Sequence, residues 1–185
     1  MNEFEFGLIE LQPRLRRFAL GLCGSLDDAD DLVQQAIERA LTRRNQWQVG
    51  TRLDSWLFRI LQSIWFNEID KRKVRKRHLQ LVADSEANTF VGKNPPESSF
   101  ELDQTRQILS TLPEDQRVAL LLVAVEGFSY KEAADTLSVP AGTVMSRVGR
   151  ARATIRDRLG AASIPQRAAS GQQNGSPRRP NYECS

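Results

Sequence analysis

The chain has 185 residues, room for one or two small domains, and it is 40% hydrophobic and 26% charged, as is usual for a globular protein. Its formal net charge is only +3 although its pI is about 9.1. No apolar run approaches the length of a membrane span, and the acidic N-terminus is unlike a secretory signal. Two cysteines, Cys23 and Cys184, are too few for a disulfide framework or a zinc site, so we expect a cytoplasmic protein with neither metal nor cofactor.

Residues 26–44 have the pattern of an amphipathic helix whose N-terminus is crowded with aspartates, where the helix dipole stabilises acidic charge. Its predicted apolar side consists of Leu32, Val33, Ala36, Ile37, Ala40 and Leu41. Its predicted polar side consists of Asp31, Gln34, Gln35 and Glu38. An ordinary structural helix explains this pattern, and so does a docking face for a protein partner; the residues alone do not choose between them.

Residues 53–77 carry apolar side chains on two sides of a predicted helix. The expected core face is Leu57, Ile60, Leu61 and Ile64. Largely off that face lie Phe58, Trp65, Phe66 and Ile69. Such a helix is either sandwiched between other elements or uses its aromatics to stack on unpaired bases, which is worth about 1–3 kcal/mol per base. A run of six basic residues between 71 and 77 follows directly, and for Trp65 and Phe66 both explanations stay open.

Residues 79–104 differ from both flanks, because they are rich in Ser, Asn, acidic residues and Pro, and Pro95–Pro96 excludes a helix through the centre. Helical character returns near Leu102, and a helix is expected from Pro113 to a C-cap at Gly127. The sequence therefore predicts an all-α protein of two small helical domains joined by a flexible linker. The predicted divisions are 1–78, an acidic linker at 79–104, 105–160, and a disordered tail at 161–185.

Residues 128–158 predict a helix, a tight turn and a second helix. Ser129 and Glu132 form a capping box that starts the first helix, and Pro140 can open the second. The second helix is expected to bury Val144, Val148, Ala151 and Ile155 and to turn Thr143, Arg147, Arg150 and Thr154 outward. Arginine and threonine on an exposed helix suit the DNA major groove, although a helical hairpin with a solvated basic face would show the same pattern.

Three segments together carry a resemblance to a known family. They are DADDLVQQAIERAL (28–41), LDSWLFRILQSIWFNEIDKRK (53–73) and LSTLPEDQRVALLLVAVEGFSYKEAADTLSVPAGTVMSRVGRAR (109–152). In this order, with a loose joint between the second and third, the chain resembles the extracytoplasmic-function (ECF) branch of the sigma-70 RNA polymerase sigma factors over roughly residues 8–160. The resemblance implies a region 2 helical bundle and a region 4 helix-turn-helix.

The resemblance implies roles for region 2. The first segment would dock on the β′ clamp of core RNA polymerase through Asp30, Asp31, Leu32, Gln34, Gln35 and Glu38. The second would bind and help to melt the −10 element through Trp65, Phe66, Asn67, Asp70, Arg72 and Lys73, and family members vary in which aromatic residue lies at the first two positions. The loop 46–54 matches the loop that captures a flipped −10 base.

For region 4, the resemblance places Thr143, Ser146, Arg147 and Arg150 against the −35 element. Met145 departs from the lysine that is common in the family, which removes one phosphate contact. The implied partners are core polymerase, through its β′ clamp and β flap, promoter DNA and an anti-sigma factor, in a stress-response setting. The acidic linker is expected to pass through the polymerase cleft.

No catalytic constellation appears in the sequence, so we expect a binding protein and not an enzyme. Two other functions stay open. The chain could be a sigma mimic that titrates an anti-sigma factor, although such mimics carry a receiver domain that is missing here. It could also be a stand-alone helix-turn-helix regulator, which would leave the aromatic and basic residues of 53–77 unexplained.

Overall fold

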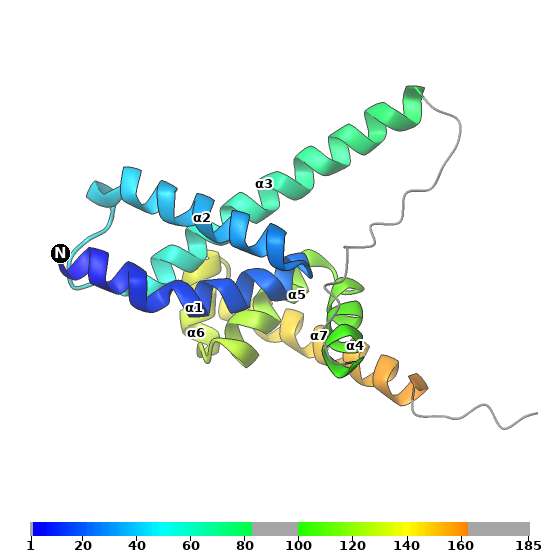
Figure 1. Cartoon of the computed structure of the whole chain (residues 1–185). Coiled ribbons are helices and arrows are strands. Elements are labelled where there is room, and N and C mark those ends of the chain that lie inside the picture. The colour runs from blue at the N-terminus through cyan, green and yellow to red at the C-terminus, as the bar shows by residue number, and fades with distance from the viewer. Residues whose placement is uncertain (1, 83–99, 163–185) are drawn as a thin grey trace, which may run out of the picture.

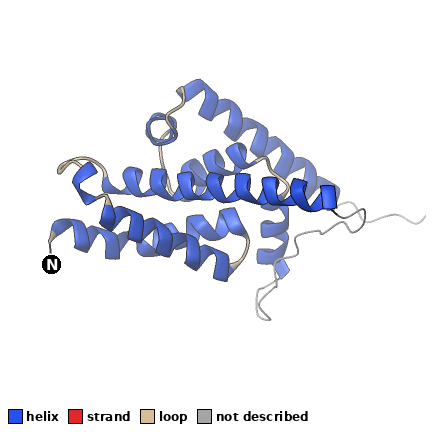
Figure 2. Ribbon diagram, turned by 90° about the horizontal axis from the view of Figure 1, so that it is seen from above, coloured by secondary structure: helices blue, strands red, loops and turns tan. Residues whose placement is uncertain are grey.

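The computed structural model describes residues 2–82 and 100–162, which form helices and turns and contain no strand (Figures 1 and 2). The N-terminal domain contains α1 (Glu3–Cys23), α2 (Leu26–Thr42), the short η1 (Arg44–Gln46) and α3 (Leu53–Val82). The C-terminal domain contains α4 (Phe100–Ser110), α5 (Glu114–Leu120), η2 (Leu121–Val125), α6 (Tyr130–Leu137) and α7 (Ala141–Ala162). The all-α class is confirmed. Of the expected linker, 79–82 and 100–104 belong to α3 and α4, and 161–162 of the expected disordered tail belong to α7; the rest of both segments lies outside the described residues.

The N-terminal domain is a bundle in which α1, α2 and α3 bury their apolar faces against one another. Phe18 and Leu22 of α1, Ala36 of α2 and Leu61 of α3 are at most 1% exposed, and this close packing supplies most of the stabilisation of such a bundle. Ser25 caps α2 by accepting a hydrogen bond from the Asp28 N–H, so the aspartates occupy its first turns. The expected apolar side of α2 was wrong at Leu41, which lies near the helix end and is 50% exposed.

In the C-terminal domain, the helix expected from Pro113 to Gly127 changes character halfway. Pro113 is the N-cap of α5, and from Leu121 the backbone widens into the π-helical turn η2. The Glu126 N–H donates to the Leu121 carbonyl at 3.0 Å, five residues back, and Gly127 then turns the chain with φ of +74°. This turn directs Leu121, Glu126 and Phe128 toward the N-terminal domain.

The two domains pack directly against each other. The Phe58 ring of α3 stands edge-on to Phe18 at 5.0 Å and to Phe128 of the C-terminal domain at 5.5 Å, and both arrangements are favourable for aromatic pairs. Leu121 approaches α1 so closely that a Cβ on Gly21 would lie 2.7 Å from its Cδ2. The second apolar side of α3 is therefore sandwiched, which is one of the two explanations that the sequence left open.

Candidate nucleic-acid and protein-binding surfaces

The helix-turn-helix consists of α6 and α7. Ser129 and Glu132 form the expected capping box, with hydrogen bonds of 2.8 and 3.2 Å. Ser138 ends α6 in the left-handed conformation, at φ of 55°, and its N–H donates to the Ala134 carbonyl. The turn places α7 across α5 and α6, with Val144 and Val148 at most 1% exposed. The opposite face of α7 is therefore left to solvent.

On that face lie the four predicted −35 residues. Ser146 and Arg150 are exposed, Thr143 is half-buried, and the Arg147 side chain is 24% exposed. The Arg147 Nε lies 3.0 Å from an Asp115 carboxylate oxygen on α5, which leaves the rest of the guanidinium fork as donors. Asp115 was not predicted, because it is distant in sequence from α7 and has no motif of its own. Met145 is also on the exposed side.

The predicted −10 residues Asn67, Asp70, Arg72 and Lys73 are all exposed on α3. This helix continues to Val82, beyond its expected end at 77, and its C-terminal half projects away from the helical bundle (Figure 1). The projecting part carries the basic run. Lys71 donates to Glu68 at 2.9 Å, and this hydrogen bond lowers the pKa of Glu68. An open groove of ≈ 770 Å³ separates this stretch of α3 from Gln35 and Arg39 of α2.

Trp65, in contrast, is 5% exposed and lies under the C-terminal domain. Its indole Nε1 donates to a Glu114 carboxylate oxygen of α5 at 3.1 Å, and the Arg72 guanidinium lies 5.9 Å from its ring centre. Phe66 is half-buried at the edge of the same core. Base stacking by Trp65 therefore requires the C-terminal domain to move away, and the role of both aromatics in DNA binding stays a prediction.

The loop between α2 and α3 borders a groove of ≈ 660 Å³ against α1. Phe6, Leu11 and Trp47 supply apolar surface there, and Thr51 supplies a hydroxyl. Asp54 closes one end: burial raises the pKa of this carboxyl, but hydrogen bonds from Arg52 and from the Ser55 N–H outweigh that effect and lower it. This is the loop in which the family resemblance places base capture, and that role stays a prediction.

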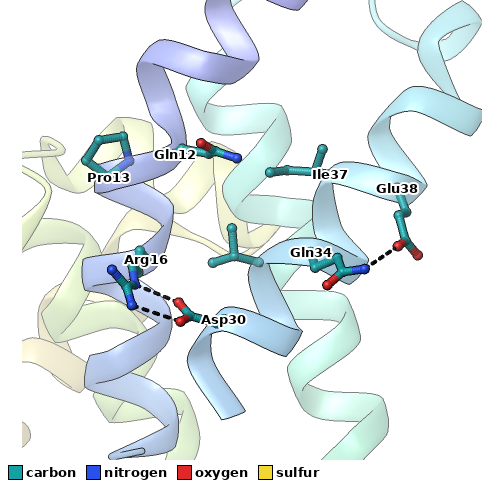
Figure 3. Close-up of a pocket in the computed structure, with 8 residues that line it drawn as sticks. Gln12, Pro13, Arg16, Asp30, Gln34, Ile37 and Glu38 are labelled. Carbon is teal, nitrogen blue, oxygen red and sulfur yellow. Dashed lines mark hydrogen bonds and ion pairs between the residues drawn. The ribbon is translucent and has the colours of Figure 1, made fainter. Parts of the chain in front are cut away.

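The predicted polymerase-binding residues lie on the outer face of α2. Asp30, Asp31, Gln34, Gln35 and Glu38 are exposed, whereas Leu32 is 4% exposed and supports this face from the core. Beside it, a groove of ≈ 680 Å³ runs between α1 and α2 (Figure 3). Asp30 accepts two hydrogen bonds from Arg16 of α1 at 2.6 and 2.8 Å, and Gln34 donates to Glu38 at 2.9 Å. The face is thus polar, acidic and held in place.

Within residues 2–82 and 100–162, no helix is long and apolar enough to cross a membrane. In the same ranges, no cluster of His, Cys, Asp or Glu could hold a metal ion. The exposed faces of α2, α3 and α7 described above carry polar and charged side chains, which suits binding to nucleic acid and protein.

Comparisons with known proteins agree with this arrangement. Residues 102–155 match the family model of sigma-70 region 4, and residues 10–62 match that of the sigma2 domain of PhyR. The ECF RNA polymerase sigma factor EcfG of Rhodopseudomonas palustris is 40% identical over 143 residues, 77% of each chain. The sigma factor RpoE of Bartonella quintana, solved in complex with the anti-sigma factor NepR, has a TM-score of 0.72 and 31% identity and covers 86% of this chain and 98% of its own.

Another solved structure also shares the fold. It comes from the PhyRSL–NepR complex of Sphingomonas sp. Fr1, with a TM-score of 0.62 at 24% identity over 91% of this chain and 96% of that one. The resemblance first carried by the DADDLVQQAIERAL, WLFRI and VPAGTVMSRVGRAR motifs is thus confirmed. The chain belongs to the ECF RNA polymerase sigma factors.

Proposed function

We propose that this sigma factor works by binding alone: it joins core RNA polymerase, directs it to the −10 and −35 elements of promoters, promotes melting and leaves after initiation. It acts in the bacterial cytoplasm, where polymerase and chromosome meet. The observation that carries the proposal is α7, a helix anchored by its apolar face whose solvent face presents Arg147 and Arg150 beside Ser146.

The −35 element is read by α7. An arginine fork can donate two hydrogen bonds to a guanine, and each such pair contributes about 1–3 kcal/mol of discrimination. Arg150 is exposed, and Arg147 is held by Asp115 with its remaining donors available. Arg152 and Arg156, also exposed, add phosphate contacts that raise affinity without choosing a sequence.

The −10 element is bound by α3 and the loop before it. Asn67, Asp70, Arg72 and Lys73 lie where α3 leaves the bundle, and a basic helix in that position can follow a DNA backbone. The outer face of α2, from Asp30 to Glu38, lies across the groove from this stretch of α3 and serves the polymerase clamp. One small domain can therefore hold polymerase and DNA together.

The linker between the domains limits how far they can separate. The two promoter elements lie about two duplex turns apart, roughly 70 Å. Residues 79–104 would span on the order of 85 Å if fully extended. Because α3 reaches Val82 and α4 begins at Phe100, a fully extended connection between them could span at most about 60 Å, and the ends of these helices must supply the rest.

Control by an anti-sigma protein is the expected regulation, because the RpoE relative was solved bound to one. Such a partner would cover the DNA- and polymerase-binding surfaces. A second function is favoured by one observation, the match of residues 10–62 to the sigma2 domain of PhyR: the chain could titrate an anti-sigma factor as a sigma mimic. A mimic needs neither the arginines of α7 nor the basic run of α3, so binding to core polymerase separates the two functions.

Run-off transcription with purified core RNA polymerase and a promoter library tests the proposal. We expect specific transcripts from the wild type, and lost or redirected transcripts from the Arg147→Ala/Arg150→Ala variant. Arg43→Ala, which removes an exposed arginine from another surface, should transcribe like the wild type. A folded wild-type protein that does not bind core polymerase would overturn the proposal and favour the mimic.

A further inference from the structure

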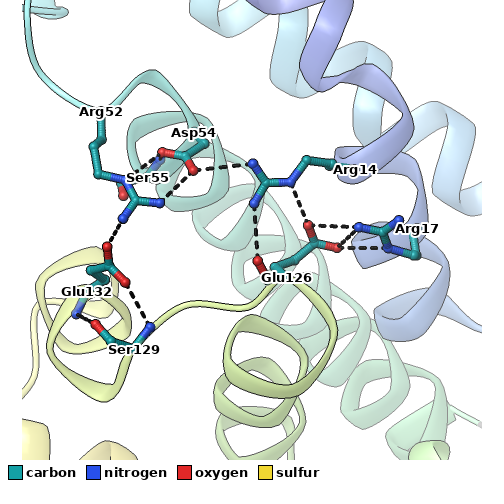
Figure 4. Close-up of polar contacts among 8 residues, drawn as sticks. All are labelled: Arg14, Arg17, Arg52, Asp54, Ser55, Glu126, Ser129 and Glu132. Atoms are coloured by element: carbon teal, nitrogen blue, oxygen red, sulfur yellow. Dashed lines mark hydrogen bonds and ion pairs between the residues drawn. The ribbon is translucent and has the colours of Figure 1, made fainter.

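The contact between the two domains centres on a buried carboxylate. The Glu126 side chain at the end of η2 is fully buried, and two arginines of α1 enclose it (Figure 4). Arg14 Nε donates to it at 3.0 Å, and Arg17 donates through Nε and NH2 at 3.1 and 3.2 Å. Arg14 also donates to the Glu126 backbone carbonyl at 3.3 Å. Both partners come from the other domain, so this charge is neutralised only while the domains are together.

The charges continue as a chain that crosses the interface a second time. Arg14 reaches Asp54 at 3.3 Å, Asp54 accepts from Arg52 at 2.7 Å, and Arg52 also contacts Glu132 of α6. Figure 4 shows these side chains pointing toward one another across the gap between α1, the start of α3 and α6. Polar contacts of this kind can be rehydrated when they separate, which suits an interface that opens.

The same interface covers α3. Trp65 donates to Glu114, and the Arg59 guanidinium donates to the carbonyls of Asp135 and Thr136 at the last turn of α6, the latter at 3.1 Å. Arg59 and Trp65 belong to the helix assigned to the −10 element. In this arrangement α6 of the helix-turn-helix covers part of α3. The two domains are in contact, although the two promoter elements that they would bind lie roughly 70 Å apart.

We propose that the Glu126 contact is an autoinhibitory latch: Arg14 and Arg17 hold the C-terminal domain on the N-terminal domain in the free protein, and the latch must open before both promoter elements are bound. The latch belongs to this chain alone and needs no anti-sigma factor. Its link to transcription rests on the proposed function, but the closed state itself does not. A protein that is open about one time in ten loses about tenfold in apparent promoter affinity.

A reversible cross-link tests the latch directly. The Leu121 Cγ lies 3.4 Å from the position of a Cβ on residue 21, so Gly21→Cys and Leu121→Cys should place two sulfurs within bonding reach. The variant is made with Cys23→Ala and Cys184→Ser so that no other thiol competes. Because the free protein is closed, we expect the disulfide to form quickly in mild oxidant. The oxidised protein should then fail to start transcription until a thiol reductant is added.

Glu126→Gln, added to the cysteine pair, tests the carboxylate itself. It keeps the size of the side chain, removes its charge and replaces one of the two acceptor oxygens by an NH2 donor, so the guanidinium groups lose the ion pair and part of their hydrogen bonding. We expect slower disulfide formation in the cysteine pair, by about three- to tenfold, and a matching gain in promoter complex formation at limiting sigma factor. Asp157→Asn, an exposed charge change on α7 away from the interface, is the matched control and should change neither quantity.

Four results decide between these possibilities. Slow disulfide formation in the otherwise wild-type pair, or an unchanged rate in Glu126→Gln, would overturn the latch. Equal transcription by the oxidised and reduced forms would overturn its inhibitory role. A reduced protein that closes as expected but does not bind core polymerase would leave the closed state intact and contradict the proposed function instead.

Discussion

The two helices assigned to promoter DNA are presented very differently in the free protein. The reading face of α7 is open to solvent, whereas α3 has its aromatic face under the C-terminal domain, with Phe58 1% and Trp65 5% exposed. The exposed helix is ready to meet DNA, and the covered helix becomes fully available only after the domains separate. Where a recognition helix lies thus matters as much as which residues it carries.

The largest expected effect concerns the covered side. Phe58→Ala should lower the free energy of unfolding by about 3–5 kcal/mol, because the ring is fully buried between Phe18 and Phe128. Phe66→Ala, at a half-buried position of the same helix, should cost clearly less. Urea unfolding followed by tryptophan fluorescence measures both. Equal losses would mean that the domain contact contributes little to stability.

On the open side, Arg150→Ala should weaken binding to a −35 duplex by about 1–3 kcal/mol, roughly 5- to 150-fold, if the fork reads a guanine. The folded stability should stay the same, since the side chain is exposed. Fluorescence anisotropy with matched and mismatched duplexes separates base reading from phosphate contact. A loss that is equal on both duplexes would contradict base reading by Arg150.

Cys23 lies within the N-terminal domain, and its thiol should make the stability of that domain depend on pH. Burial, aided by Asp28, raises the pKa of its thiol from 9.0 to about 12. The folded thiol therefore stays protonated where the unfolded one ionises, so stability is full below pH 9 and falls as the pH rises toward 12. The loss approaches about 1.4 kcal/mol per pH unit within that window.

Cys23→Ala isolates this contribution. Denaturant unfolding of both proteins at pH 7, 9 and 10 should show wild-type stability falling faster than that of the variant above pH 9. Parallel curves would show that the thiol ionises equally in the folded and unfolded states.

The smallest effect is expected at the turn between α6 and α7. Ser138 has φ of 55°, a conformation that costs a residue with a Cβ some free energy and costs glycine little. Ser138→Gly should therefore raise the free energy of unfolding by about 0.5–1 kcal/mol and leave DNA binding unchanged. Thermal unfolding and anisotropy check the two statements; a destabilised variant would mean that the serine side chain contributes more than its backbone costs.

Much of the fold was predictable because its signals are local. The Ser129–Glu132 capping box, the spacing of Val144 and Val148 and the turn before Pro140 lie within a few residues of one another, and the structure has the helices there. The two apolar sides of 53–77 also indicated that the helix is sandwiched or stacks on bases. The sequence could not choose, because the answer depends on a second domain.

What the sequence could not predict depends on distant contacts. Glu126 pairs with Arg14, from which it is separated by 112 positions in the sequence, and Arg147 pairs with Asp115 on another helix. No periodicity encodes such pairs. The π-helical turn at Leu121–Val125 likewise has no Gly or Pro within it to mark it, and its Leu121 packs against Gly21 of α1, a residue distant in the sequence.

The distance between the two domains, in the free protein and on promoter DNA, tests the account most directly. Donor and acceptor dyes on Asp27→Cys and Ser110→Cys, both exposed positions, report it by single-molecule energy transfer in a Cys23→Ala/Cys184→Ser background. In the closed arrangement Arg117 donates to the carbonyls of both Leu22 and Ser110, so the two labelled positions lie near each other across the domain contact. The account predicts high transfer in the free protein and low transfer in the complex with core polymerase and promoter, where the domains lie roughly 70 Å apart. Low transfer in the free protein, or no change on the promoter, would contradict it.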